Sequence, residues 1–415
     1  MIKTGKWIVC RFPVFFLRTG KESAILYAMS RKKAVVRKPK IKKKTDYYDY
    51  SLLAVIILLT CFGLVMLYST SSYMAELNYG DDMYYFKKQA AISLACIIAA
   101  LAISQMDYHI LTRFTGVIYG VAAVLMLLVK TPLGRSANGA RRWLNLGPLS
   151  FQPSELAKIA VIVCLSYMIV NMGRKIGTLK GFMMLAGSGG ALAFITYVFT
   201  DNLSTAIIIF GITIGLIFIA HPKVRPFLIA AGILLVVAIV AISFLSATME
   251  TSSSFRLRRI LVWLHPEDYA SGDGYQTIQA LYAIGSGGFL GRGLGNSIQK
   301  LGSVPEAQND MIFSIVCEEL GILGGMIVLL LFAYLLYRLF FIAQNAPDLF
   351  GSLIVTGIFI HIALQVILNI AVVLNLMPNT GVTLPFISYG GTSIVFLMLE
   401  MAIALSVARQ IKFQE

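Results

Sequence analysis

The sequence predicts an all-α polytopic membrane protein with about ten transmembrane helices. Both termini are expected in the cytoplasm, with a large extracellular loop between the seventh and eighth helices. Of the 415 residues, 58% are hydrophobic and only 13% are charged, and the mean hydropathy is +0.78. Soluble domains carry about a quarter charged residues, whereas apolar runs long enough to cross about 30 Å of hydrocarbon recur along this chain.

Ten apolar runs account for the predicted helices. In chain order they are 51–71, 88–105, 110–130, 155–172, 182–200, 203–220, 226–246, 312–343, 351–376 and 385–409. The eighth run is longer than one crossing needs, so we expect it to tilt or to start outside the membrane. The predicted regions are a basic cytoplasmic tail 1–48, a membrane domain 49–410 that includes the outer loop 247–311, and a cytoplasmic end 411–415.

The net charge of +15 belongs to the N-terminal tail. Residues 1–50 hold 14 of the 35 Lys and Arg residues but only 3 of the 20 acidic residues. The basic run from Arg31 to Lys44 directly precedes the first span, so we interpret it as a cytoplasmic anchor under the positive-inside rule. The alternative is a patch for anionic lipid or nucleic acid, and we expect no nucleic-acid partner. Residues 1–28 make a poor signal peptide, and we hypothesise that Met29 is the native start.

Two predicted outer loops are unexpectedly basic. With the tail inside, the positive-inside rule places the third and seventh connections outside. Their basic residues are Arg135, Arg141, Arg142, Arg256, Arg258, Arg259, Arg292 and Lys300. Guanidinium groups capture phosphate in a bidentate fork, so one interpretation is a phosphorylated ligand at the outer surface. The other is binding of lipid headgroups or internal salt bridges. The acidic candidates for such bridges are Glu250, Glu267, Asp268 and Asp273.

The first polar motif lies at the start of the fourth predicted helix. Arg141 and Arg142 can bind anions, and Trp143 offers a face for the membrane interface or for stacking on a sugar. Glu155 and Lys158 are i,i+3 neighbours and can form an ion pair. Ionisable residues at that depth are functional candidates, while the alternative is a structural pair that braces the helix.

The second motif ends the large outer loop with Pro305-Glu-Ala-Gln-Asn-Asp310. Asp310 is predicted at the mouth of a helix, where the helix N-terminus can keep its carboxylate ionised and ready to accept a proton from a hydroxyl. The alternative is a plain helix cap. Glu318 and Glu319 lie about two turns deeper, and burial of carboxylates is unfavourable, so we expect them to pair or to bind a cation.

A third segment, 378–393, is rich in proline and glycine and contains Ser388. Irregular backbone at membrane depth must be buried in protein or line a cavity, so we interpret this segment as a wall of the site. Gln365 and Asn369 on the preceding helix can satisfy its backbone groups. The four His and five Cys residues show no metal-ligand spacing, so no metal site is predicted from them.

At these motifs the sequence resembles the SEDS family (shape, elongation, division and sporulation) of bacterial cell-wall proteins. The resemblance is carried by Asn138-Gly-Ala-Arg-Arg-Trp-Leu, Phe151-Gln-Pro-Ser-Glu, Gly274-Tyr-Gln-Thr-Ile-Gln, Gly291-Arg-Gly-Leu-Gly-Asn-Ser, Pro305-Glu-Ala, Glu318-Glu-Leu-Gly and Leu384-Pro-Phe-Ile-Ser-Tyr-Gly-Gly-Thr-Ser. It extends roughly from Asp49 to Gln410, and details of the large loop favour the FtsW division branch, including its sporulation relative, over the RodA elongation branch.

The resemblance implies a ten-helix peptidoglycan glycosyltransferase that polymerises lipid II at the outer face of the bacterial cytoplasmic membrane and releases undecaprenyl pyrophosphate. It also implies a class B penicillin-binding protein and other divisome membrane proteins as partners, with a role in cell-wall synthesis at the division septum. The family's essential aspartate lies in Pro-Glu-Ala-His-Thr-Asp and carries over to Asp310. Here Gln308 and Asn309 replace the His and Thr of that pattern. No cofactor is certain, and a divalent cation, Mg²⁺ or Mn²⁺, stays open.

Asp310 is therefore the expected catalytic base for the 4-hydroxyl of the acceptor GlcNAc. The candidates for substrate binding are Arg141, Arg142, Trp143, Glu155, Lys158, Arg256, Arg259, Glu306 and Ser388. Two other functions stay open: a transporter that flips lipid II, and a non-catalytic scaffold for a penicillin-binding protein. The polar motifs cluster on one side without an inverted repeat, which favours the enzyme. Glu400, deep in the last span, is the one feature that a transporter would explain.

Overall fold

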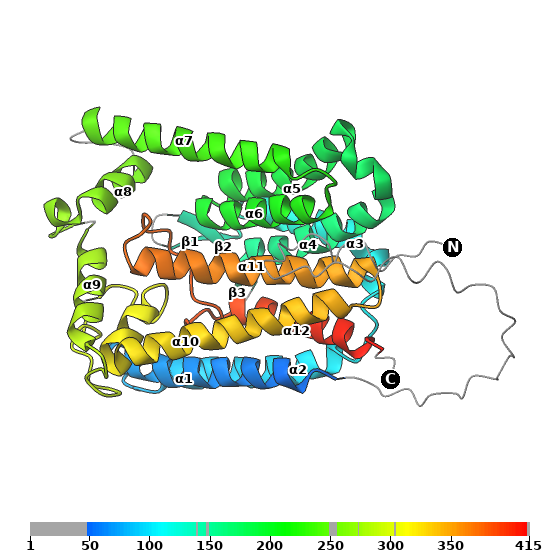
Figure 1. The fold of residues 1–415 in the computed structure, drawn as a ribbon. Coiled ribbons are helices and arrows are strands. Elements are labelled where there is room, and N and C mark those ends of the chain that lie inside the picture. The colour runs from blue at the N-terminus through cyan, green and yellow to red at the C-terminus, as the bar shows by residue number, and fades with distance from the viewer. Residues whose placement is uncertain are drawn as a thin grey trace, which may run out of the picture.

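The protein is described by a computed structural model that covers residues 48–412 apart from 138–139, 147–148, 249–254, 273 and 303. Long helices lie side by side in a bundle, and shorter elements gather at one end (Figure 1). Within the described residues, eight helices are long and apolar enough to cross a membrane. They are α1 (Tyr50–Tyr79), α2 (Tyr84–Ile103), α3 (Ile110–Leu128), α4 (Pro153–Met172), α5 (Leu179–Phe199), α6 (Leu203–Ala220), α10 (Ile312–Asn345) and α11 (Leu349–Val373).

Two further helices, α7 (Arg225–Thr248) and α12 (Ser393–Arg409), lie where spans were predicted. The mostly helical membrane architecture is confirmed, while the total of ten crossings stays a prediction. The predicted start of the last helix at residue 385 is wrong. Phe386 has a φ of 63° and Gly391 a φ of 47°, both in the left-handed region, so the helix begins only at Ser393.

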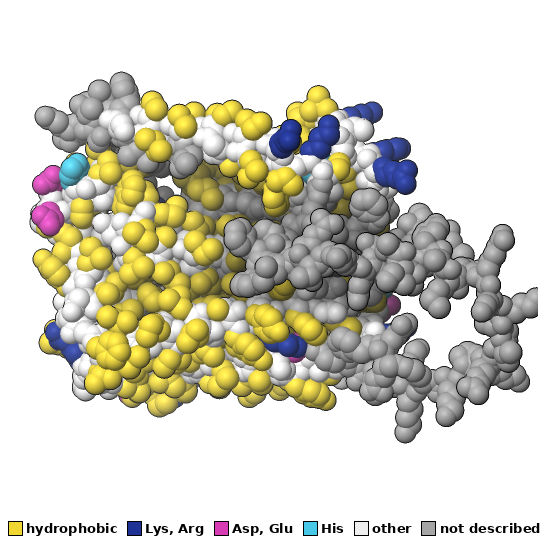
Figure 2. Space-filling view, viewed as in Figure 1, with side chains coloured by type: hydrophobic (Ala, Val, Ile, Leu, Met, Phe, Trp, Pro, Cys, Tyr) yellow, Lys and Arg dark blue, Asp and Glu magenta, His cyan; other side chains and the backbone are white. Residues whose placement is uncertain are grey.

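Apolar side chains cover the outside of the bundle as well as its interior. Figure 2 shows hydrophobic side chains over the face between the two ends, whereas charged side chains lie toward the ends. On α7, large side chains such as Leu228, Ile233 and Val240 are more than half exposed. Soluble monomers rarely expose an apolar surface this continuous. The belt therefore faces hydrocarbon, and the prediction of a multi-pass membrane protein is confirmed.

A small antiparallel sheet, which the all-α prediction missed, connects α3 to α4. Its strands pair in the order β1 (Gly134–Ala137), β2 (Ala140–Leu146) and β3 (Leu149–Phe151). Arg135 lies opposite Trp143, and Leu144 lies opposite Phe151. Such short strands give too few alternations of apolar and polar residues to be told from a loop in the sequence. The sheet gives the basic motif at Arg141 an ordered backbone.

The two ends of the bundle differ in their elements. The remaining short elements are η1 (Gly173–Gly177), α8 (Phe255–Leu264), η2 (Pro266–Tyr269) and α9 (Tyr275–Gly287). We call the end with the sheet, α8 and α9 the loop end, and the opposite end the terminal end (Figure 1). At the terminal end, Arg338 donates to Asp49 at 2.7 Å, and Arg409 donates to the carbonyl of Gln105 at 3.1 Å. The predicted outer and inner loops thus lie at opposite ends, and which end faces the cytoplasm stays a prediction.

The overlong eighth run is a broken helix. Within α10, Gly321 has φ 69° and ψ −169°, far from helical values. The glycine-rich loop packs against this break so closely that a Cβ on Gly291 would lie 2.2 Å from the carbonyl oxygen of Glu319. The amide of Gly293 donates to the same carbonyl at 2.9 Å. The loop thus helps to satisfy backbone groups that the break leaves unpaired at membrane depth.

The basic tail and the expected start at Met29 lie outside the described residues, as do Glu250 and Asp273. These parts of the sequence analysis stay predictions. The domain boundaries also stay predictions.

Candidate active site at the loop end

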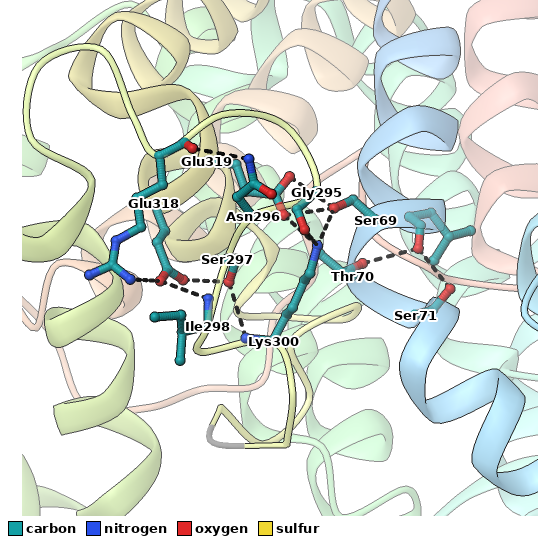
Figure 3. Close-up of polar contacts among 12 residues, drawn as sticks. Ser69, Thr70, Ser71, Gly295, Asn296, Ser297, Ile298, Lys300, Glu318 and Glu319 are labelled. Atoms are coloured by element: carbon teal, nitrogen blue, oxygen red, sulfur yellow. Dashed lines mark hydrogen bonds and ion pairs between the residues drawn. The ribbon is translucent and has the colours of Figure 1, made fainter.

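Two ion pairs to buried glutamates fasten the large loop to the bundle (Figure 3). Lys300 donates to Glu319 at 2.8 Å and to Ser69 of α1 at 2.9 Å. Arg292 lies 3.6 Å from Glu318, and both glutamates are fully buried. The prediction that the two glutamates pair is confirmed. The basic residues of the loop are expected from the sequence either to bind a phosphorylated ligand or to form internal salt bridges. Arg292 and Lys300 form internal salt bridges, and their partners are the acids of α10.

The ion pairs also shape the chain that leads into α10. Ser297 donates its hydroxyl to Glu318 and accepts from the amide of Lys300 at 3.1 Å. Figure 3 shows these contacts converging from the loop, α1 and α10. Because Asp310 follows Lys300 closely in the chain, this anchored loop determines where Asp310 meets the bundle.

Asp310 is a buried acid with an unsatisfied oxygen. Its residue is 7% exposed, and its Oδ1 has no hydrogen-bond partner among the described residues. The pKa of Asp310 is raised to about 7, mainly by burial and also by the negative charge of Glu306, while the positive charge of Arg259 opposes the shift. The N-cap position of α10 is Met311, so the geometry does not favour the helix-cap alternative. A carboxylate whose pKa lies near the working pH is suited to general base catalysis.

Arg259 of α8 lies within electrostatic range of both Asp310 and Arg142 of β2. Arg259 donates to the carbonyl of Asn379 at 3.1 Å, and Arg142 donates to the carbonyl of Asp201 at 3.2 Å. Burial and the charge of Arg259 lower the pKa of Arg142, and Arg259 also acts on Asp310. Arg259 therefore lies between the two other charged groups in its electrostatic interactions, acting on each of them. Two guanidinium groups held close together favour an anionic ligand such as a phosphate.

A cavity of about 270 Å³ opens beside Arg259, between α8 and α9. Trp263 lines it and donates to the carbonyl of Asn375 at 3.0 Å, while Asn379 donates to the side chain of Gln276 at 2.7 Å. The lining combines an aromatic ring, amides and a guanidinium group, the mixture by which pockets orient polar ligands. The sequence predicts Arg259 as a binding residue but does not predict that role for Trp263 or Gln276, because only the fold brings them to one cavity.

The other predicted binding residues of the loop end occupy different surroundings. Arg141 is exposed on β2, and Trp143 is half-buried. Glu306 is exposed, has a left-handed φ of 57° and accepts from the side chain of Asn309. A non-glycine residue in that region is strained and often marks a functional segment. The side chain of Arg256 lies outside the described residues, so its role stays a prediction.

The segment 375–392, which we call the wall segment, lies beside the loop of Asp310. The hydroxyl oxygen of Ser388 accepts from the amide of Leu384 at 2.8 Å, so it closes a turn within the segment. The amide of Tyr389 donates to the carbonyl of Gln308 at 2.9 Å. The residue that replaces the family's histidine therefore joins the loop to the wall through its backbone.

Glu155 and Lys158 form the predicted ion pair at 3.0 Å, and both are buried. Lys158 also donates to Oε1 of Gln365 at 3.3 Å. The same oxygen lies 2.9 Å from Nε2 of His361, whose Nδ1 lies 2.8 Å from Glu400. Glu400, whose role the sequence alone does not explain, thus belongs to a buried polar chain that joins α4, α11 and α12.

The fold and the site define a multi-pass helical membrane protein with a buried acid and arginines at one end of its bundle. Residues 49–413 match the FtsW, RodA and SpoVE family, described as "Cell cycle protein". The chain is 36% identical over 373 residues to stage V sporulation protein E of Bacillus subtilis (strain 168), with 89% of this chain and 99% of that protein covered. It is 34% identical over 387 residues to the probable peptidoglycan glycosyltransferase FtsW of Trichlorobacter lovleyi, with 91% and 97% covered.

Two solved structures share the fold. One comes from work on the structural coordination of polymerization and crosslinking by a peptidoglycan synthase complex, with a TM-score of 0.72, 26% identity, and 87% of this chain and 98% of that chain covered. The other is the rod shape determining protein RodA of Thermus thermophilus, with a TM-score of 0.63, 25% identity, and 89% and 98% covered. The chain belongs to the FtsW, RodA and SpoVE family, and the predicted SEDS membership is confirmed.

Proposed function

We propose that this protein is a peptidoglycan glycosyltransferase that polymerises lipid II at the outer face of the cytoplasmic membrane. The observation that carries the proposal is Asp310, a buried carboxylate with an oxygen that has no hydrogen-bond partner among the described residues and that lies within electrostatic range of Arg259. Relatives named probable peptidoglycan glycosyltransferase support the reaction class. The loop end is then the outer end, because lipid II presents its sugars and pyrophosphate there.

The reaction assigns one role to each charged group. Asp310 accepts the proton of the acceptor GlcNAc 4-hydroxyl while that oxygen forms a bond to the anomeric carbon of the donor. The bond from this carbon to the pyrophosphate oxygen breaks, and undecaprenyl pyrophosphate leaves with the electron pair. Arg259 and Arg142 stabilise the negative charge that develops on the pyrophosphate. A general base of this kind typically contributes about 10²–10⁴-fold to the rate.

A Mg²⁺ or Mn²⁺ ion is compatible with these residues. The described residues contain no group of three or more His, Cys, Asp or Glu side chains that could hold a metal ion. Mg²⁺, however, often binds one or two carboxylates together with substrate phosphates. Such an ion would be held mainly by the substrate phosphates, and it would neutralise the negative charge of the pyrophosphate.

A polymerisation assay with purified lipid II tests the proposal. The protein is purified with its class B penicillin-binding protein, and glycan strands are separated by gel electrophoresis. Asp310→Asn should abolish the strands, because the amide cannot accept the proton. Asp81→Asn is the matched control, because Asp81 lies in the exposed α1–α2 turn and pairs with Lys87. Strand synthesis by Asp310→Asn at the wild-type rate would overturn the role of Asp310.

The alternative functions give different results in the same experiment. A lipid II transporter would move the lipid across vesicle membranes without making strands. A scaffold would support its partner equally well with and without the Asp310 carboxylate. The septal role is tested separately: a fluorescent fusion should concentrate at the division site, and the penicillin-binding protein that co-purifies should be the division-specific one.

A further inference from the structure

Three polar residues of α11 form a row inside the bundle. His361, Gln365 and Asn369 are spaced four residues apart, so they lie on one face of the helix. Each is at most 4% exposed. Polar side chains buried at membrane depth require partners, and the partners of this row extend from the polar chain of Glu400 to the backbone of the candidate base.

Asn369 connects the loop that carries Asp310 to the wall segment. Its Nδ2 donates to the backbone carbonyls of Asp310 and Val382, both at 2.7 Å. Because both partners are carbonyl oxygens, the amide must present its NH₂ group to them, and both of its hydrogens are used. The clamp holds Asp310 beside Gly381, on which a Cβ would lie 3.8 Å from Oδ2 of Asp310.

Gln365 supports the wall segment at the neighbouring residue. Its Nε2 donates to the carbonyl of Thr383 at 3.0 Å, and its Oε1 accepts from Lys158 at 3.3 Å. An ammonium group can only donate and a carbonyl can only accept, so these two partners fix the orientation of the amide. His361 must therefore donate to Oε1 through its Nε2. The buried polar chain of Lys158, His361 and Glu400 thus prevents the Gln365 amide from flipping.

We propose that Asn369 is a positioning residue for Asp310. By clamping the backbone of Asp310 to a wall segment that Gln365 holds in place, it keeps the carboxylate inside its buried pocket. The inference rests on the proposed role of Asp310 as the base and names a residue on which that role depends.

Loss of the clamp has a chemical consequence that simple destabilisation lacks. Burial is the largest contribution to the pKa of Asp310, and the charged groups that act on its carboxylate are Glu306 from its own loop and Arg259 from α8. If the backbone moves outward, water reaches the carboxylate and its pKa falls toward that of an ordinary aspartate. The base also moves away from the acceptor hydroxyl, and a displacement of about 1 Å can lower a rate by about 10²-fold.

The test is the pH profile of lipid II polymerisation by two variants in the complex with the penicillin-binding protein. Asn369→Ala should lower kcat by about 10–100-fold with little change in KM, and should move the acid limb to lower pH. Asn369→Leu, which has a similar branched shape but no N–H to donate, should also lower kcat and move the acid limb to lower pH, because the clamp is lost. Asn345→Ala on α10, where the side chain is exposed and donates to the Phe341 carbonyl, should match the wild type.

The outcomes separate this inference from the proposed function. A fall in kcat with an unmoved acid limb in both variants would show that Asn369 is merely structural, and a rise in KM alone would show that it contacts the substrate. Either result overturns the inference while Asp310 keeps its role. Wild-type activity of Asp310→Asn would instead remove the proposed function. If Asn369→Ala does not fold, the Asn369→Leu profile decides.

Discussion

Lys300 of the large loop and Glu319 of α10 form an ion pair at 2.8 Å with side chains only 7% and 0% exposed. Ser69 of α1 completes the contact by donating to the carboxylate and accepting from the ammonium group. The intact pair contributes little net stability, because desolvation offsets the Coulomb attraction, but removal of one partner leaves an uncompensated buried charge. The pair therefore controls whether the loop docks at all.

Removal of the Glu319 carboxylate should strongly destabilise the protein. Glu319→Ala is expected to lower the free energy of unfolding by about 3–5 kcal/mol, measured as thermal unfolding in detergent. The double variant with Lys300→Met should regain most of the loss, because no unpaired charge remains. Lys87→Ala breaks an exposed pair with Asp81 and should cost far less stability, because solvent screens such a pair. Equal losses for the buried and exposed pairs would contradict this account.

The polymerisation rate should rise with pH through neutrality. The base must be deprotonated to act, and the pKa of Asp310 is raised to about 7, so activity is present above that pH and lost below it. Between pH 6 and pH 8 the rate should increase by about tenfold. The measurement is initial strand synthesis from lipid II over this range. An acid limb near pH 4, as for an exposed aspartate, would show that Asp310 is not buried when it acts.

Arg259→Gln should affect both substrate binding and the base. Loss of a charged hydrogen bond to pyrophosphate corresponds to about 1.5–3 kcal/mol, so kcat/KM for lipid II should fall by about 10–100-fold. The acid limb should also move to higher pH, because the positive charge of Arg259 lowers the pKa of Asp310. Arg113→Gln on α3 is the control, since that exposed residue is expected to leave both quantities unchanged. An unmoved acid limb in Arg259→Gln would show that the charge of Arg259 does not act on Asp310.

Two glycine substitutions in one region should have opposite effects. Gly291 has a φ of +81°, and a Cβ there would lie 2.2 Å from the Glu319 carbonyl oxygen, so Gly291→Ala should undock the loop and reduce both stability and activity. Gly285 lies within α9 with no atom within 4 Å of an added Cβ. Gly285→Ala should therefore be neutral or stabilise by up to about 1 kcal/mol. Thermal unfolding of the two variants is the measurement, and similar melting temperatures would contradict the close approach at Gly291.

The sequence allowed local features to be predicted well. The Glu155–Lys158 pair is formed as expected from its i,i+3 spacing. That Glu318 and Glu319 need partners was also predictable from their depth, but not that the partners are Arg292 and Lys300. The predictions that failed needed information from elsewhere in the fold. The first residues of the 385–409 run are apolar enough for a helix, but their backbone is taken up by contacts with the loop of Asp310, such as the bond from the amide of Tyr389.

By itself the sequence determined the class of environment, because apolar runs of about 20 residues are stable as helices only in hydrocarbon or a buried core. It also determined which residue types were available for chemistry. Only the tertiary structure decided their partners, since Lys300 meets Glu319 across 19 positions of the chain and Asn369 meets Asp310 across 59. Whether a basic residue binds a carboxylate or faces the cavity depends on such packing, which local spacing does not encode.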